Sequence, residues 1–79
     1  MKILLFAQLG EVIAPEVTVE LPENLTRQNV LSALAAAFPL QAALIKSSNV
    51  AVNQTYLTDV PVSRESANEI AIIPPVSGG

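Results

Sequence analysis

The sequence contains no histidine and no cysteine, and its only glycines are Gly10, Gly78 and Gly79. Without imidazole and thiol groups, the usual zinc sites, catalytic nucleophiles and general bases cannot be built. So few glycines, two of them at the end of the chain, also exclude a glycine-rich phosphate-binding loop. The lack of cysteine rules out disulfides and is compatible with a reducing cytoplasm. Any chemistry of this chain must therefore come from other groups.

Positive charge and aromatic side chains are scarce as well. The net charge is −3, and the four cations are scattered along the sequence, as are the aromatic residues: Lys2, Arg27, Lys46 and Arg64, with Phe6, Phe38 and Tyr56. Nucleic-acid binders cluster their cations to neutralise phosphates and often offer aromatic faces to the bases. We therefore expect no nucleic-acid partner.

Apolar residues, by contrast, are abundant. They make up 51% of the 79 residues, against 14% charged residues, which is typical of one small folded domain. This is more apolar side chain than so small a core holds, so part of it should reach the surface and meet a partner. The apolar run at residues 1–7 is too short for a signal peptide, and no stretch approaches the ~20 residues of a membrane helix. We expect a soluble, cytoplasmic protein.

Hydrophobic periodicity predicts the first half of the fold. Residues 2–8 are almost all apolar and suit a buried strand, residues 10–15 contain a turn signal, and residues 16–21 alternate as a half-buried strand. These two strands should form a hairpin. A helix should follow, capped by Asn24 or Thr26 and interrupted by Pro39, with a second short helical piece at residues 40–46.

The second half returns to strands. Residues 49–53 predict a short strand, residues 56–58 a brief pairing, residues 59–68 an irregular segment, and residues 69–73 a last strand stopped by Pro74 and Pro75. This order predicts an α+β fold of the β-grasp (ubiquitin-like) kind, a mixed sheet with one main helix packed on one face. The first and last strands should lie side by side at its centre. We place the domain at residues 1–74 and an extended tail at residues 75–79, and we expect exposed apolar surface on the sheet face that the helix leaves open.

The tail ends in Gly78-Gly79, an unexpected pair in a chain so poor in glycine. A terminal carboxylate, with a pKa near ~3.5, is ionised and can attack the α-phosphate of ATP. A sulfur nucleophile can then displace the nucleotide and leave a thiocarboxylate. Glycine suits such a terminus, because a side chain would block a narrow active-site channel. An inert tail or a cloning remnant stays open as the alternative.

Three segments together resemble a known family. The ending Ile72-Ile73-Pro74-Pro75-Val76-Ser77-Gly78-Gly79, the first strand Leu5-Phe6-Ala7-Gln8 and the middle strand Ala51-Val52-Asn53-Gln54 are similar to those of the small, sulfur-carrier subunits of molybdopterin synthase. The resemblance covers the whole chain in order and length, and the Pro-Pro-Val-Ser-Gly-Gly ending is its most specific part.

This resemblance implies a function located at the C-terminus. An E1-like enzyme would use ATP to adenylate Gly79, and a sulfur donor protein would convert the adenylate to a thiocarboxylate. The insertion segment, Pro74, Pro75, Val76, Ser77 and Gly78, would enter the large catalytic subunit of a heterotetramer, with Ile72 and Ile73 at the interface. Sulfur would pass to precursor Z to form the molybdopterin dithiolene. The chain itself would bind no cofactor or metal and would have no independent activity.

The sequence departs from the family at three places. Members often have Arg at the position of Gly10, aromatic residues at Ile72 and Ile73, and an Asp-Gly-Asp-Glu type turn where residues 66–69 read Ser-Ala-Asn-Glu. The aliphatic replacements preserve apolar contact, but they leave the detailed interface undetermined.

Three alternatives stay open from the sequence. The chain could be a related sulfur carrier for thiamine synthesis or tRNA thiolation, a protein modifier that forms isopeptide bonds through Gly79, or an interaction domain with an inert tail. The residues before the two glycines favour the molybdopterin carrier over its relatives. We interpret Glu16, Glu20 and Glu23 as a solvated strand edge, since hard-cation sites need several converging oxygens.

Overall fold

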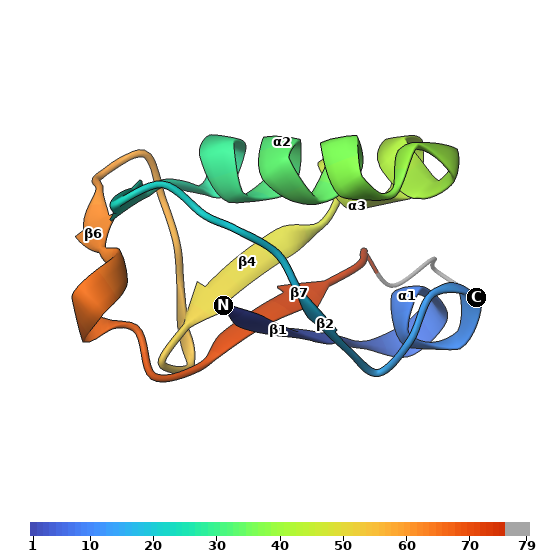
Figure 1. The fold of residues 1–79 in the computed structure, drawn as a ribbon, viewed down its shortest axis with the longest axis horizontal. Coiled ribbons are helices and arrows are strands. Elements are labelled where there is room, and N and C mark those ends of the chain that lie inside the picture. The colour runs from blue at the N-terminus through green and yellow to red at the C-terminus, as the bar shows by residue number, and fades with distance from the viewer. Residues whose placement is uncertain (76–79) are drawn as a thin grey trace.

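The computed structural model describes residues 1–75, whose main sheet is twisted and covered on one face by helices (Figure 1). The main sheet has the strand order β2-β1-β7-β4-β5, and β3 and β6 form a separate two-stranded sheet. The strands are β1 (Lys2–Leu5), β2 (Glu16–Thr18), β3 (Asn24–Leu25), β4 (Asn49–Val52), β5 (Thr55–Tyr56), β6 (Val62–Ser63) and β7 (Ile70–Ile73). The helices are α1 (Ala7–Val12), α2 (Arg27–Ala37) and α3 (Ala42–Lys46), with 3₁₀ turns η1 (Pro39–Gln41) and η2 (Arg64–Ser66).

The sheet is mixed, and its centre is the predicted one. Strands β1 and β7 pair in parallel, with Leu5 opposite Ile72, while β7 and β4 pair antiparallel from Asn49 opposite Ile73 to Val52 opposite Ile70. The β-grasp expectation, with the first and last strands adjacent and one main helix on one face, is confirmed. The last strand of the domain therefore lies inside the sheet, hydrogen-bonded on both sides.

Helix α2 begins and ends where its sequence dictates. The Thr26 hydroxyl accepts the Asn29 N–H at 3.2 Å, and the Asn29 side-chain oxygen accepts the Thr26 N–H at 2.9 Å. This reciprocal capping box selects Thr26 as the cap, and the Asn29 amide also donates to the Asn24 carbonyl. At the other end Pro39 cannot continue the helix, and η1 begins there.

The core lies between this helix and the inner face of the sheet. Alternation along each strand sends every second side chain inward. The fully buried large side chains come from all the main elements: Ile3, Leu9, Leu25, Val30, Leu34, Ile45, Val50, Ile70 and Ile72. Within the described part of the chain, no helix has the length and apolar character to cross a membrane.

The connection between β1 and β2 differs from the prediction. Strand β1 ends at Leu5 instead of Gln8, and residues 7–12 form a helix where a turn was expected. Helix α1 lies so close to β1 that a Cβ placed on Gly10 would be 2.7 Å from the Leu5 carbonyl oxygen. The glycine that suggested a turn is thus needed for contact between a helix and a strand. The predicted strand at 16–21 is also shorter and ends at Thr18.

Replacing Gly10 by Ala should therefore destabilise the fold. In a free helix this change stabilises by ~1 kcal/mol. Here the new methyl group would collide with backbone, and relieving the collision should cost about 1–3 kcal/mol. Chemical denaturation measures the difference, and Ser32→Ala at an exposed position of α2 is the control, for which a small gain is expected. A stabilised Gly10→Ala protein would contradict the close approach.

A two-residue hairpin joins β4 to β5 and anchors the start of β7. Asn53 and Gln54 have φ of 52° and 69°, the pattern of a type I′ turn between paired Val52 and Thr55. The Asn53 side-chain oxygen accepts the N–H groups of Asn68 and Glu69 at 2.8 and 3.1 Å, and its amide donates to the Ser66 carbonyl at 2.9 Å. One side chain thus connects this turn to the segment that leads into the last strand.

Gln54→Gly should stabilise the protein by roughly 0.5–1 kcal/mol. Glutamine is unfavourable at a positive φ, whereas Asn-Gly is the preferred pair for this turn. The melting temperature should rise, and the matched change Gln41→Gly in η1, at a residue with an ordinary negative φ of −105°, should lower it through the greater backbone freedom of glycine. A lower melting temperature for Gln54→Gly would contradict the turn assignment.

Candidate functional site: the end of strand β7 and the open sheet face

Strand β7 is the last element before the C-terminal segment. It is paired with β1 on one side and β4 on the other, so its direction is fixed by the sheet. Directly after it, Pro74 is buried and Pro75 is exposed. Of the predicted insertion segment, Val76, Ser77 and Gly78 lie outside the described residues, as does the predicted reactive residue Gly79. The structure thus defines the base from which the terminal segment begins.

The two predicted interface residues point in opposite directions. Ile72 is 0% exposed and belongs to the core, whereas Ile73 is half-buried and belongs to the opposite face. The prediction that Ile72 contacts a partner is wrong for its side chain, because neighbours on a strand alternate between faces. The burial of Pro74 likewise makes this residue part of the domain, so the exposed part of the insertion segment begins at Pro75.

A band of apolar residues crosses the sheet face that α2 does not cover. Leu4 pairs with Ala71, Ala71 with Ala51, and Ala51 with Tyr56, so these four residues lie side by side on one face. Ile73 follows Ala71 on the same face. Ala51 and Ala71 lie outside the core cluster but are only 7% and 4% exposed, so the accessible area of this band comes from Leu4, Tyr56 and Ile73. We call this set, Leu4, Ala51, Tyr56, Ala71 and Ile73, the open face.

Large exposed side chains border the open face. Tyr56 is 62% exposed on the edge strand β5. Phe6, which follows Leu4 by two positions and is still extended, is 46% exposed beside the end of β7, where its N–H donates to the Ile72 carbonyl at 3.1 Å. Sequence reasoning treated these aromatic residues as isolated. Only the strand register shows that they lie at the margins of one surface.

Charge is confined to the margin of the open face. The Lys2 ammonium and the Glu16 carboxylate are 3.9 Å apart across β1 and β2, and both side chains are largely solvated. Such an exposed pair contributes little to stability. The open face therefore carries no charge between Leu4 and Tyr56, although the exposed, uncharged Asn49 lies opposite Ile73 on the same side of the sheet.

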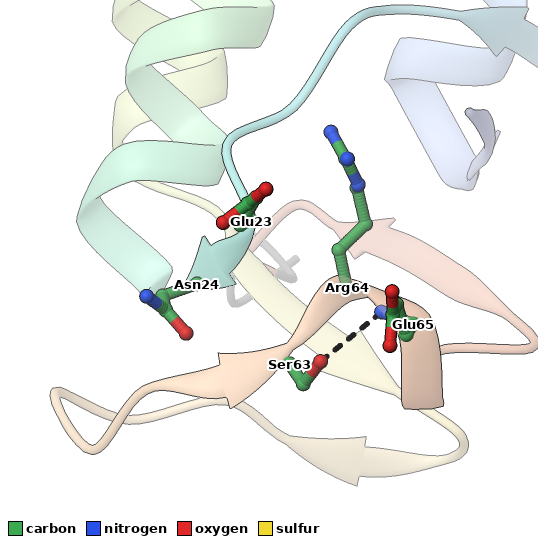
Figure 2. A pocket seen from close by; sticks show the side chains of 5 residues that line it. All are labelled: Glu23, Asn24, Ser63, Arg64 and Glu65. Atoms are coloured by element: carbon green, nitrogen blue, oxygen red, sulfur yellow. Dashed lines mark hydrogen bonds between the residues drawn. The ribbon is translucent and has the colours of Figure 1, made fainter.

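A small pocket of about 200 Å³ lies elsewhere, between β3 and η2 (Figure 2). Glu23, Asn24, Ser63, Arg64 and Glu65 line it. The Arg64 guanidinium donates to the Leu21 carbonyl and its backbone N–H to that of Glu23 at 2.8 Å, while Ser63 Oγ accepts the Glu65 N–H at 3.3 Å. These contacts fasten the segment around β6 to the segment before α2. Within residues 1–75, no group of three acidic, histidine or cysteine side chains could hold a metal ion.

Comparison with known proteins agrees with this geometry. The sequence model of the ThiS family matches residues 3–79. A molybdopterin synthase sulfur carrier subunit from Dictyostelium discoideum is 42% identical over 81 residues, covering 99% of this chain and 94% of the relative. One from Arabidopsis thaliana is 37% identical over 79 residues, covering 99% and 81%. The crystal structure of SAMP1 from Haloferax volcanii, a ubiquitin-like β-grasp protein, has a TM-score of 0.71 at 30% identity, covering 99% of this chain and 97% of that one. The chain therefore belongs to the ThiS family and, within it, to the molybdopterin synthase sulfur carrier subunits.

Proposed function

We propose that this chain carries sulfur as a thiocarboxylate on Gly79 and delivers it, within molybdopterin synthase, to precursor Z. The observation that carries the proposal is the Gly78-Gly79 ending in a member of this family. The last strand before this ending, β7, is central in the sheet. Since the sequence has neither histidine nor cysteine, the terminal carboxylate is the group best suited to chemistry. Catalytic side chains would come from the partner.

Activation of the terminus would take two steps on an E1-like enzyme. A Gly79 carboxylate oxygen attacks the α-phosphorus of ATP, forming an acyl-adenylate and releasing pyrophosphate. The outer sulfur of a donor protein's persulfide then attacks the carbonyl carbon, AMP leaves with its electron pair, and an acyl disulfide is formed. A thiol attacks the donor's sulfur in this acyl disulfide, forms a disulfide with it, and releases the thiocarboxylate. ATP is bound by the activating enzyme, and the sulfur carrier needs no cofactor of its own.

The large subunit is the partner that would complete the site. The segment from Pro75 to Gly79 would span at most about 16 Å when extended, at ~3.3 Å per residue. That is long enough to place the terminus inside a neighbouring protein while the domain remains outside. We propose that the open face, with Ile73 next to the base of the segment, docks on the large subunit. Its apolar character and lack of central charge suit a stable protein–protein contact.

Reconstitution tests the acceptor. Thiocarboxylated chain is mixed with the large subunit and precursor Z, and molybdopterin is measured against chain that has a plain carboxylate. The proposal predicts product only from the thiocarboxylated chain. Sulfur passing instead to a thiamine thiazole precursor or to tRNA, with none reaching precursor Z, would identify a different carrier. Lysine adducts through Gly79 would identify a protein modifier.

A further inference from the structure

The ladder between β1 and β7 ends at a specific pair of groups. Within residues 1–75, its last hydrogen bond runs from the Phe6 N–H to the Ile72 carbonyl at 3.1 Å. In a parallel ladder, a residue that donates to one partner accepts from the N–H two residues further along the same partner strand. The Phe6 carbonyl would therefore accept next from residue 74. That residue is a proline and has no N–H to give.

The Phe6 carbonyl forms a hydrogen bond within α1 instead of with β7. It accepts the Gly10 N–H at 3.4 Å, in the first turn of that helix. This is long for such a bond, and a strand donor at ordinary distance would be stronger. Phe6 is the N-cap residue of α1, so its carbonyl accepts the first bond of that helix. The proline at position 74 offers it no competing donor.

Ala7 turns the chain out of the sheet at the same point. Its φ of 50° lies in the left-handed region, which is unfavourable for a residue with a side chain. Among the described non-glycine residues only Asn53 and Gln54 share a positive φ, and the β4–β5 hairpin explains both. Ala7 is not part of a two-residue turn; it is the first residue of α1, in the longer connection between β1 and β2. Strained backbone of this kind persists where the surrounding structure fixes it.

The surroundings of Ala7 do fix it. Leu9 is fully buried in the core, and Gly10 lies against the Leu5 carbonyl. Helix α1 therefore cannot move away without exposing Leu9, and β1 cannot continue beside the end of β7. The β1–β7 ladder therefore stops at the same height on both strands. On β7 it stops at Pro74, and on β1 it stops where the chain turns away at Ala7.

We propose that Phe6, Ala7 and Pro74 form a release junction, which ends the β1–β7 ladder at Pro74 so that the C-terminal segment is presented to the activating enzyme and is not added to the sheet. Ala7 and Pro74 are then positioning residues for Gly79. This purpose rests on the proposed function, whereas the end of the ladder itself rests on hydrogen bonds and φ alone.

Restoring an N–H at position 74 tests the junction. Pro74→Ala supplies the missing donor for the Phe6 carbonyl, and Pro75→Ala is the matched control, because its N–H would face the β4 side. Since Pro74 is buried, Pro74→Val is made in parallel to retain volume. Amide hydrogen exchange is measured at residue 74 or 75, and the kcat and KM of Gly79 activation are measured by intact mass.

The junction predicts slower exchange at residue 74 than at residue 75, on the order of tenfold for one added hydrogen bond. It also predicts a fall of similar size in kcat/KM for Gly79 activation in the position-74 variants and little change in Pro75→Ala. Equal exchange at the two positions would overturn the junction. Protection at residue 74 with undiminished activation would overturn its role in presenting Gly79. Failure of the unchanged chain to acquire sulfur would instead count against the proposed function, since the exchange measurement needs no sulfur chemistry.

Discussion

Removal of Gly79 is expected to abolish molybdopterin formation while leaving the domain folded. The reacting carboxyl would then belong to Gly78, one residue short of its place in both the activating enzyme and the large subunit. A misplacement by one residue moves the reacting atom by ~3.3 Å, far more than the ~1 Å that can cost a hundredfold in rate. The rate should therefore fall by at least that factor. Product formation in the reconstituted synthase measures the loss.

Two observations make this result specific. The melting temperature should be unchanged, because the helices and strands of the described part of the chain all end by Ile73. Ser77→Ala is the control, since it alters the same segment but retains its length and its terminal glycine. A truncated chain that still supports full product formation would rule out Gly79 as the sulfur-bearing residue.

Ile73→Asp is expected to weaken binding to the large subunit by at least tenfold. The side chain is half-buried on the open face, next to the base of the C-terminal segment. A carboxylate there would lose its hydration in the interface without gaining a partner, which costs well over ~1.4 kcal/mol, or a factor of ten in affinity. Titration calorimetry with the isolated large subunit gives the dissociation constant directly.

Two further substitutions to aspartate serve as controls. Leu40→Asp places the same charge on a side chain that is 93% exposed in η1, which the open face does not include, and its affinity should be unchanged. Ile72→Asp should instead prevent folding, because it buries a charge in the core. Equal affinities for Ile73→Asp and the unchanged chain would show that the large subunit does not bind at the open face. A folded and stable Ile72→Asp protein would contradict the described register of β7.

The elements with clear periodicity could be predicted from the sequence. The apolar run of β1, the alternation of β2, the stripe on α2 and the run of β7 each match one structural repeat, and Thr26 and Pro39 mark the ends of α2. Because β1 and β7 are the most continuously apolar segments, their pairing at the centre of the sheet could be predicted as well. Local pattern and tertiary packing agree for these segments.

Helix α1 could not be predicted in this way. Gly10 has a low helix propensity and stands in a short segment before Pro15, so the local signal favours a turn. The helix forms because Leu9 is buried in the core and the small Gly10 fits against β1. These are contacts between segments, and they override local preference. The β3–β6 pair was also not predicted, because a strand of two residues is too short to show an alternation of apolar and polar side chains.

The candidate site also has one part that the sequence could predict and one part that it could not. The reactive terminus is a short motif and could be identified from sequence together with the family resemblance. The open face could not, because Leu4, Ala51, Ala71 and Tyr56 come from four strands and meet only through their register. The assignment of Ile72 failed for the complementary reason: both residues of the Ile72–Ile73 pair are apolar, and which one faces the core depends on that register.

The most direct test of the central claim is the intact mass of the chain after incubation with an E1-like activating enzyme, ATP and a sulfur source. The account predicts a gain equal to the replacement of one oxygen by sulfur, located at Gly79 and absent from the chain that lacks this residue. An unchanged mass, with the enzyme shown to be active on another sulfur carrier, would contradict it.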